Sequence, residues 1–470
     1  MLLPAALAAL GLAACVAGPN FVTPAAPRAA QYTAAPLPNL ESGEQRLDGA
    51  LVEPAQWWTL LHSPNLDSTI GVALAANRAL AAARARLSEA QELSGASEAG
   101  RYPRAELDAS AGRQKYGAAF LGPEQLPPFT FYSIGPAVSY TFDYTGGVRR
   151  TIEQQRALTD YQEHELDAAA LSVSGNVAMQ ALTAAAARSQ IESLEALLAE
   201  DRNNLNLVQD AFAAGGASRV DVLNAQSQLA NDETLLPPLR GELSAADNAL
   251  ALLLGQSPGA WTAPQFTLVE FTLPPRLPLA VPSEVVHRRP DILAAEAQLH
   301  AATAAAGIAS ANLYPQISLT ASASLQSATL HALFERSAAA GGLTGSLAAP
   351  LFDHGALRAR QRAATDAMHA SLADYEQVVL SSFGQVADAL EALDHDQELL
   401  SSEQRAAATA ADNLALTRES YSAGNSGVLQ VLEAQRQEQQ ARLGLVRAQA
   451  LRLQDTVRLL LSLGGGIPQA

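Results

Sequence analysis

The sequence predicts an α+β protein that combines four membrane-type β-strands with two unusually long antiparallel helix pairs. Two proline-free stretches, Ala137 to Leu236 and Leu351 to Ile467, each read as a long helix, a glycine turn and a returning helix. The first helix of each stretch is expected to have about 65 residues and a length of about 100 Å. Helices in globular domains rarely exceed about 25 residues. Such rods favour mechanical reach across a gap over chemistry in a pocket.

The chain also resembles itself at an offset of roughly 210 residues, which indicates gene duplication. The matching segments are Tyr102-Pro103 with Tyr314-Pro315, Phe142-Asp143 with Phe352-Asp353, and Ala214 to Gln226 (AGGASRVDVLNAQ) with Ala423 to Gln435 (AGNSGVLQVLEAQ). We therefore expect two copies of one unit, repeat 1 at 56–260 and repeat 2 at 284–470. Each copy should hold a helix, a strand hairpin, a long helix and a return helix.

The N-terminus has the pattern of a lipoprotein signal. Residues 2–14 (LLPAALAALGLAA) are apolar, and Leu12-Ala13-Ala14-Cys15 matches the lipoprotein box, in which the thiol of the cysteine accepts the lipid. This segment is too short for a membrane span. The sequence therefore predicts a signal peptide at 1–14 and a lipidated, extended segment at 15–55, with Cys15 as the anchor. An ordinary signal peptide with an accidental cysteine is the alternative.

Four segments alternate between apolar and small polar residues, which is the period of a β-strand with one wet face. These segments are 104–112, 131–143, 316–326 and 342–352. Their lengths of about 10 residues are typical of transmembrane β-strands. A two-sided sheet in a soluble protein is the competing interpretation, and the secretion signal argues against it.

Four strands cannot close a barrel, and an open sheet edge is not tolerated in lipid. Several chains must therefore contribute. Two chains would give eight strands, whose interior fills with side chains, whereas three would leave a water-filled lumen. This favours a homotrimer, although strand spacing alone does not exclude more copies.

The long helices carry coiled-coil spacing, with apolar residues at alternating steps of three and four. The two seams are Val379, Phe383, Val386, Leu390 and Leu393, and Leu443, Val446, Ala450, Leu453, Val457 and Leu460. The return helix at about 220–255 and the helix at 284–313 are each half as long as the rods. A proline-rich linker at 261–283 and the segment 18–55 are extended by composition.

Composition excludes several function classes. The net charge of −17 argues against nucleic-acid binding, which needs a basic footprint. The eight histidines are scattered, and we find no metal-ligand cluster, phosphate loop or nucleophile motif. The sequence predicts no enzyme activity and no cofactor other than the covalent lipid on Cys15. Energy for transport must then come from a partner.

Across nearly its whole length the chain resembles the trimeric outer-membrane efflux channels of the TolC/OprM/NodT lipoprotein type. The resemblance rests on CVAGPNFVTP after the lipoprotein box, HRRPDILAAEAQLHAATAAAGIASANLYPQISL, PLFDHGALRARQRAA and SYSAGNSGVLQVLEAQ. It implies a 12-stranded β-barrel in the bacterial outer membrane, continued by a 12-helix barrel across the periplasm with a mixed equatorial region. It also implies multidrug efflux with a periplasmic adaptor and an inner-membrane pump, usually of the resistance-nodulation-division class.

The resemblance also implies a closed aperture at the periplasmic tip, where the helix hairpins turn. The turns correspond to Ala214-Gly215-Gly216 and Ala423-Gly424-Asn425, which are the expected adaptor-docking positions. The aperture positions correspond to Leu429 and Glu433, with Val220, Asp221 and Asn224 in the first repeat. The acid is Glu here rather than the commoner Asp. The competing interpretation is that Leu429 and Glu433 complete a coiled-coil layer and a solvated face.

Three other functions remain open at this point. A lipid-anchored coiled-coil spacer would need no amphipathic strands. A duct for protein secretion would share the architecture, and the lipoprotein box favours small-molecule efflux by resemblance only. A secreted enzyme on a helical scaffold lacks the necessary chemistry.

Overall fold

A computed structural model describes residues 16–25, 31–34, 36–42, 45–49, 56–115, 127–279 and 282–466. Cys15 and the expected signal peptide lie outside these residues. The chain forms two compact units, which we describe separately. The first unit comprises Met1–Pro24, Leu87–Gln162 and Ala295–Tyr375, and the second comprises Ala25–Arg86, Glu163–Ala294 and Glu376–Ala470.

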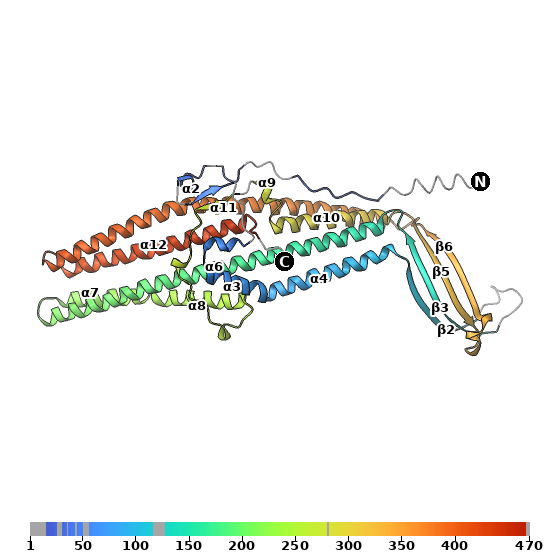
Figure 1. Cartoon of the computed structure of the whole chain (residues 1–470), viewed down its shortest axis with the longest axis horizontal. Helices are drawn as coiled ribbons and strands as arrows, with labels where there is room; N and C mark the ends of the chain where they lie inside the picture. Colours follow the sequence, from blue (N-terminus) through green and yellow to red (C-terminus); the bar gives the residue numbers. More distant parts are fainter. Residues whose placement is uncertain are drawn as a thin grey trace. The chain divides into compact units, whose positions relative to one another are not determined.

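The first unit contains a four-stranded antiparallel sheet of order β2-β3-β5-β6 (Figure 1). Its strands are β2 Arg104–Gln114, β3 Phe129–Phe142, β5 Gln316–Ser327 and β6 Ala339–Ala348. All four expected strands are present. The expected end of the last strand at 352 is wrong, because Pro350 lacks the N–H that would extend the ladder.

The two repeats meet in this sheet where β3 pairs with β5. Ile134 pairs with Leu325 and Ala137 with Ser322. Between these pairs, a Cβ on Gly135 would lie 2.1 Å from the carbonyl oxygen of Ala323 and 2.4 Å from the Cα of Ser324. The strands therefore approach too closely at this point for any residue but glycine.

The two expected rods are confirmed. They are α6, Gly147–Ala213, and α11, Ala356–Ser422, with 67 residues each. Each starts at a repeat-related aspartate: Asp143 accepts hydrogen bonds from the N–H groups of Val148 and Arg149, and Asp353 accepts them from Gly355 and Leu357. A carboxylate at a helix N-terminus satisfies otherwise unpaired donors. This role explains why the aspartate of the Phe-Asp pair occurs in both repeats.

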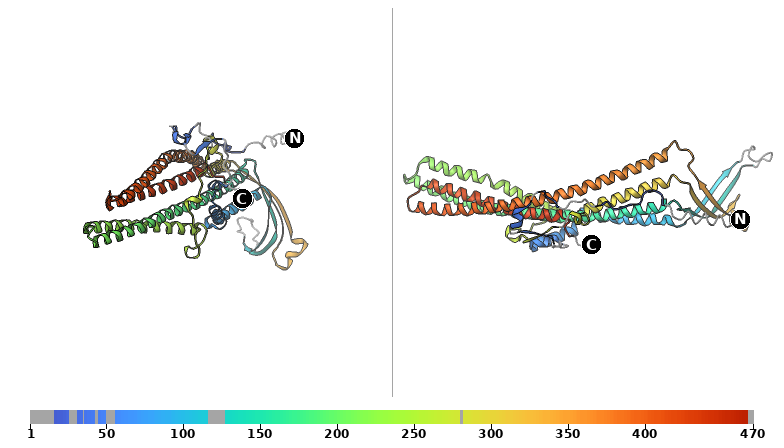
Figure 2. Two further views of the ribbon diagram at one scale, coloured as in Figure 1. Left: turned by 60° about the vertical axis from the view of Figure 1, so that its left-hand side comes forward. Right: turned by 90° about the horizontal axis from the view of Figure 1, so that it is seen from above.

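The second unit holds the returning helices, which run back along the rods (Figure 2). The return helix of repeat 2 is α12, Val428–Ser462. The expected single helix at 220–255 is wrong, because repeat 1 has two helices there, α7 Arg219–Glu233 and α8 Leu236–Leu253. Two prolines follow Leu236, and proline is accepted only in the first turn of a helix. The chain therefore breaks at Thr234 and Leu235.

Proline also breaks the expected helix at 284–313. It consists of α9, Pro282–Val285, and α10, Pro290–Ala311. Pro290 cannot continue a helix that comes from its N-terminal side, but it suits the first position of a new one. The helix that opens repeat 1 is also divided, into α3, Pro64–Ala76, and α4, Arg78–Glu98, but without a proline. This break falls at Asn77, whose side chain accepts hydrogen bonds from the N–H groups of Ala79 and Leu80 at the start of α4.

The segments that we expected to be extended contain some regular structure. A short helix, α2, spans Pro38–Ser42, and β1, Arg46–Asp48, pairs in parallel with β4, Arg276–Pro278. Single 3₁₀ turns lie at Pro258–Ala260 and Leu268–Glu270. The N-terminal segment and the linker are thus joined by a two-stranded ladder within the second unit.

The core of the second unit surrounds the coiled-coil seams. Val379, Val386, Leu390 and Leu393 are buried, whereas Phe383 is half-buried beneath the ring of Tyr32. In α12 the buried seam residues are Ala450, Leu453, Val457 and Leu460, while Leu443 and Val446 are half-buried. The seams are thus confirmed as packing surfaces. Among the described residues, no helix combines the length and apolar character needed to cross a membrane.

Candidate functional site

The two hairpin turns have the same backbone structure. Gly215 has φ +82° and Gly424 has φ +76°, a conformation that glycine adopts without steric cost. In the first turn the N–H of Gly216 donates to Ala211 and that of Gly215 to Phe212; in the second, Asn425 donates to Ser420 and Gly424 to Tyr421. This pair of hydrogen bonds is the Schellman ending of a helix. The expected glycine turns are therefore confirmed as structure.

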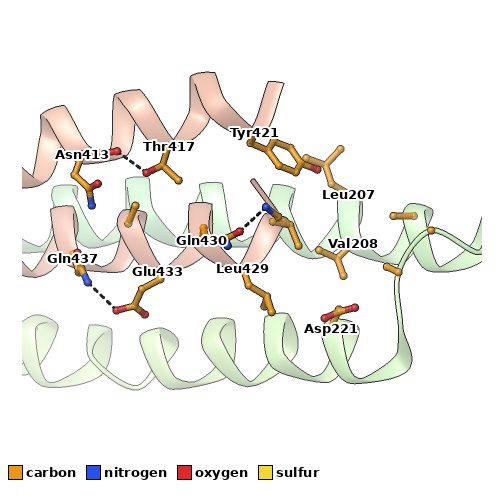
Figure 3. A pocket seen from close by; sticks show the side chains of 16 residues that line it. Leu207, Val208, Asp221, Asn413, Thr417, Tyr421, Leu429, Gln430, Glu433 and Gln437 are labelled. Carbon is orange, nitrogen blue, oxygen red and sulfur yellow. Dashed lines mark hydrogen bonds between the residues drawn. The ribbon is translucent and has the colours of Figure 1, made fainter. Parts of the chain in front are cut away.

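Beside these turns, a cavity of about 760 Å³ that is open to solvent lies between the two hairpins (Figure 3). Leu429 and Glu433 of α12 and Asp221 of α7 are among the residues that line it. The opposite side carries Leu207 from α6 and Tyr421 from α11. The structure thus brings three of the five expected aperture residues into one cavity. Val220 and Asn224 are exposed and are not among its lining residues.

Leu429 and Glu433 lie one helical turn apart on α12, and both have exposed side chains. The Glu433 carboxylate accepts hydrogen bonds from Arg436 at 2.6 and 3.1 Å and from Gln437 at 3.0 Å. These donors hold the pKa of Glu433 below its usual value, Arg436 having the largest effect. The carboxylate is therefore ionised but already paired within its own helix. Sequence analysis missed Arg436, although its spacing of three residues is typical of a helical ion pair.

Asp221 has a structural role that sequence analysis did not anticipate. Its carboxylate accepts a hydrogen bond from the N–H of Ser218, and the Ser218 hydroxyl accepts one from the N–H of Asp221. This reciprocal capping box begins α7. The hydrogen bonds from Ser218 lower the pKa of Asp221. The repeat-related Gln430 contacts the N–H of Gly427 in the same way at the start of α12.

A polar network joins the first hairpin to the second next to the cavity, at residues that directly follow its lining residues Thr417 and Ala434. Glu200 of α6 accepts hydrogen bonds from Arg418 of α11 and from Gln435 of α12, both at 2.7 Å. Asn204 donates to Gln435 at 2.9 Å. Gln435 is buried, whereas the side chains of Glu200 and Arg418 are about half exposed, so the network runs from the interface between the hairpins to the surface. These residues are more than 200 positions apart, and no pattern in the sequence pairs them.

In the first unit, residues 16–23 lie against the start of α6 and against α10. The N–H of Ala17 donates to Thr145 at 2.8 Å, and the buried Arg150 donates to Asn20 at 2.7 Å. The ring of Phe21 stacks on His300 at 4.3 Å. This segment, which we call the N-terminal strap, begins one residue after Cys15. It starts beside the junction of β3 and α6, where Ala17 contacts Thr145, and ends against α10, where Phe21 stacks on His300 and the Thr23 hydroxyl donates to Glu296 at 2.8 Å.

The described residues contain no group of three or more histidine, cysteine, aspartate or glutamate side chains that could hold a metal ion. The candidate site is thus a cavity at the hairpin turns, lined by apolar and amide side chains and by paired charges.

A four-stranded antiparallel sheet on paired 67-residue helices defines a class of proteins, the outer-membrane channels with a periplasmic helical extension.

The chain belongs to the outer membrane efflux protein family, whose model matches residues 69–256 and 281–465. It is 32% identical over 418 residues to the pyoverdine export outer membrane protein OpmQ of Pseudomonas aeruginosa, covering 87% of each chain. It is 28% identical over 467 residues to the cation efflux system protein CusC of Escherichia coli, covering 98% of each. The outer-membrane channel OprN has a similar structure, with a TM-score of 0.88 and 28% identity over 96% of this chain and 99% of OprN.

The protein is therefore a non-enzymatic efflux channel of the bacterial outer membrane that extends into the periplasm. Its family forms trimers that work with an adaptor and an inner-membrane pump. Each chain contributes four strands, so the barrel of 12 strands needs three copies. These findings remove the spacer and the secreted enzyme as alternatives.

Proposed function

We propose that this channel is the passive exit duct of a resistance-nodulation-division efflux system for drugs and other toxic small molecules. Three copies form one tunnel, and a ring of Leu429 and Glu433 closes its periplasmic tip at rest. The observation that carries the gate is the position of both residues in one cavity beside the hairpin turns. Their exposed side chains are available to neighbouring copies in a trimer.

The gate is tested by single-channel conductance of the purified trimer in planar bilayers. The double variant Leu429→Ala/Glu433→Ala should raise the conductance of the resting channel. The matched control is Leu223→Ala/Glu233→Ala, which also removes an exposed leucine and an ion-paired glutamate, but on α7. An increase of the same size in both variants would contradict the gate, as would no increase in either.

The polar network at Glu200 supports the resting state in this proposal, because it ties α6 to both helices of the second hairpin. Removing it should loosen the tip without changing the gate residues. Glu200→Gln keeps the shape and loses the charge, so it should raise conductance less than the double gate variant. A conductance equal to that of the wild type would show that this network does not hold the channel closed.

The turns Gly215-Gly216 and Gly424-Asn425 are the proposed docking points of the periplasmic adaptor. They are exposed, and both have the same backbone shape. Cysteines at Gly216 or Asn425 should crosslink to the adaptor, whereas a cysteine at Gly241 on α8 should not. Purification after crosslinking in cells would also identify the pump, and recovery of an ATP-driven transporter in place of a proton-driven one would contradict the assigned class.

Cys15 is the proposed lipid anchor. The N-terminal strap supports this role, because Ala17 is held at Thr145, immediately beyond the end of β3. An acyl group on Cys15 would therefore enter the membrane next to the strands. Labelling with palmitate should mark the wild type and not Cys15→Ser, and an unlabelled wild type would refute the assignment.

A further inference from the structure

Two buried carboxyl groups face each other between α6 and α7. Asp201 lies on α6 and is 5% exposed, and Asp232 lies in the last turn of α7 and is 9% exposed. Their side chains are within hydrogen-bonding reach of each other. Burying two ionised carboxylates side by side is very costly, so such pairs hold a proton between them.

The other neighbours do not remove this conflict. Gln228 donates to Oδ2 of Asp232 at 2.7 Å, whereas Oδ2 of Asp201 accepts no hydrogen bond from any described residue. A carboxylate at a helix C-terminus is also opposed by the helix dipole, and this applies to Asp232. Within the described structure, a proton is thus the missing partner of this pair.

The surrounding charges are largely paired with one another. Glu200 on α6 contacts Arg418 of α11, Arg202 pairs with Glu233 at 2.9 Å, and Arg240 of α8 pairs with Glu195 at 2.8 Å. Arg436 of α12 has an attractive charge interaction with Asp232 but is engaged by Glu433. Glu200 adds repulsion to Asp201. Burial, followed by Asp232 and Glu200, raises the pKa of Asp201 to about 7.

The pair lies at the end of α7, so its charge state affects how firmly this helix end is attached to α6. Asp232 directly precedes the break at Thr234 and Leu235, so α7 is not continued rigidly by α8. Nearby apolar packing consists of a small cluster, Leu194, Leu197 and Leu198 of α6 with Leu229, Leu236 and Leu239. Repulsion at the pair therefore acts at a helix end whose other contacts with α6 include this cluster and the largely exposed ion pair of Arg202 with Glu233.

We propose that one proton shared by Asp201 and Asp232 clamps α7 to α6, so that the first hairpin is tight in an acidic periplasm and loosens at alkaline pH. The clamp is a regulatory device in the wall of the channel. Its effect on conductance rests on the proposed gate at the tip, whereas its effect on the hairpin does not.

The first test measures the hairpin alone, by hydrogen exchange of the α7 amides in the detergent-solubilised trimer, corrected for the intrinsic pH dependence of exchange. In the wild type, protection of α7 should fall at least about tenfold between pH 6 and pH 8, since one unit of pKa corresponds to a factor of ten. Asp232→Asn and Asp201→Asn should each abolish this dependence, because the amide holds the bridge without a proton. Glu233→Gln, at the adjacent exposed position, should retain it.

Protection that is independent of pH in the wild type would overturn the clamp. Restoration of protection at pH 8 by 1 mM Ca²⁺ or Mg²⁺ (a concentration of the order at which weak extracellular sites bind) would also overturn it, because the pair would then hold a cation. If one Asn variant fails to fold, the other still decides the question. Conductance is measured separately on the same proteins, so that pH-dependent protection with pH-independent conductance would keep the clamp and remove only its link to the gate.

Discussion

Arg289 offers a sharp test of how the second unit is held together. Its side chain is buried and makes four hydrogen bonds: to Asp291 at 2.7 and 3.0 Å, to the carbonyl of Ser462 at 2.9 Å and to Gln385 at 2.8 Å. One guanidinium group thus joins the start of α10 to α11 and to the end of α12. We predict that Arg289→Met destabilises the protein by about 3 kcal/mol, because each hydrogen bond to a charged group contributes about 1.5–3 kcal/mol. The bonds to the half-exposed Asp291 contribute less.

The neighbouring Arg288 provides the control. It is exposed, and its ion pair with Glu284 spans 3.7 Å, so Arg288→Met should cost less than about 1 kcal/mol. Arg289→Lys should lie between the two, since lysine keeps the charge but loses the planar fork. Thermal unfolding of the trimer, followed by circular dichroism, should show a midpoint about 3 °C or more lower for Arg289→Met than for Arg288→Met. Equal midpoints would refute the reasoning.

Three further predictions concern the charges and the sheet. Arg436→Gln leaves the Glu433 carboxylate without its ion pair and should therefore increase the cation selectivity of the channel. The selectivity is measured as the reversal potential across a salt gradient. An unchanged reversal potential would place Glu433 outside the conducting path. Gly135→Val should prevent trimer assembly, as seen on gels, because the valine side chain would meet the backbone of β5. The control Gly342→Ala in β6 has room for its methyl group and should assemble. Equal assembly of the two variants would contradict the close approach of the strands at Gly135. Asp396→Asn should stabilise the protein by about 2 kcal/mol more at pH 8 than at pH 5, because burial and then Asp455 raise the pKa of Asp396 to about 7. The folded state then holds a proton that the unfolded state releases, so wild-type stability falls as the pH rises from about 4 to 7. A difference in unfolding midpoint between Asp396→Asn and the wild type that is the same at pH 5 and pH 8 would contradict this prediction.

The long elements could be predicted because their patterns persist over many residues. The rods and the four strands each repeat one period many times, so a few exceptions do not hide it. Because the sequence is duplicated, the same elements are predicted twice, once in each repeat. The turns at Gly215 and Gly424 were recognisable for a related reason, since only glycine favours their positive φ.

The helix breaks were predictable in principle but were missed. Proline follows Leu236 and stands at position 290, and each marks the start of a new helix rather than a bend in an old one. The short strands at Arg46–Asp48 and Arg276–Pro278 gave no usable pattern, because three residues do not define a period.

The polar contacts of the candidate site could not be predicted. Glu200 pairs with Arg418 and Gln435 only because the fold brings two hairpins together, and no local spacing connects these residues. Likewise, Asp201 and Asp232 belong to separate helices, and each looks like an ordinary polar residue on its own. Sequence could indicate which residues lie near the tip, but not which of them touch.

The break between α7 and α8 has no counterpart in α12, which runs uninterrupted from Val428 to Ser462. A complete trimer therefore contains three jointed hairpins and three stiff ones. Any bending at Thr234 is available to only half of the hairpins, so dilation of such a tunnel would follow threefold rather than sixfold symmetry.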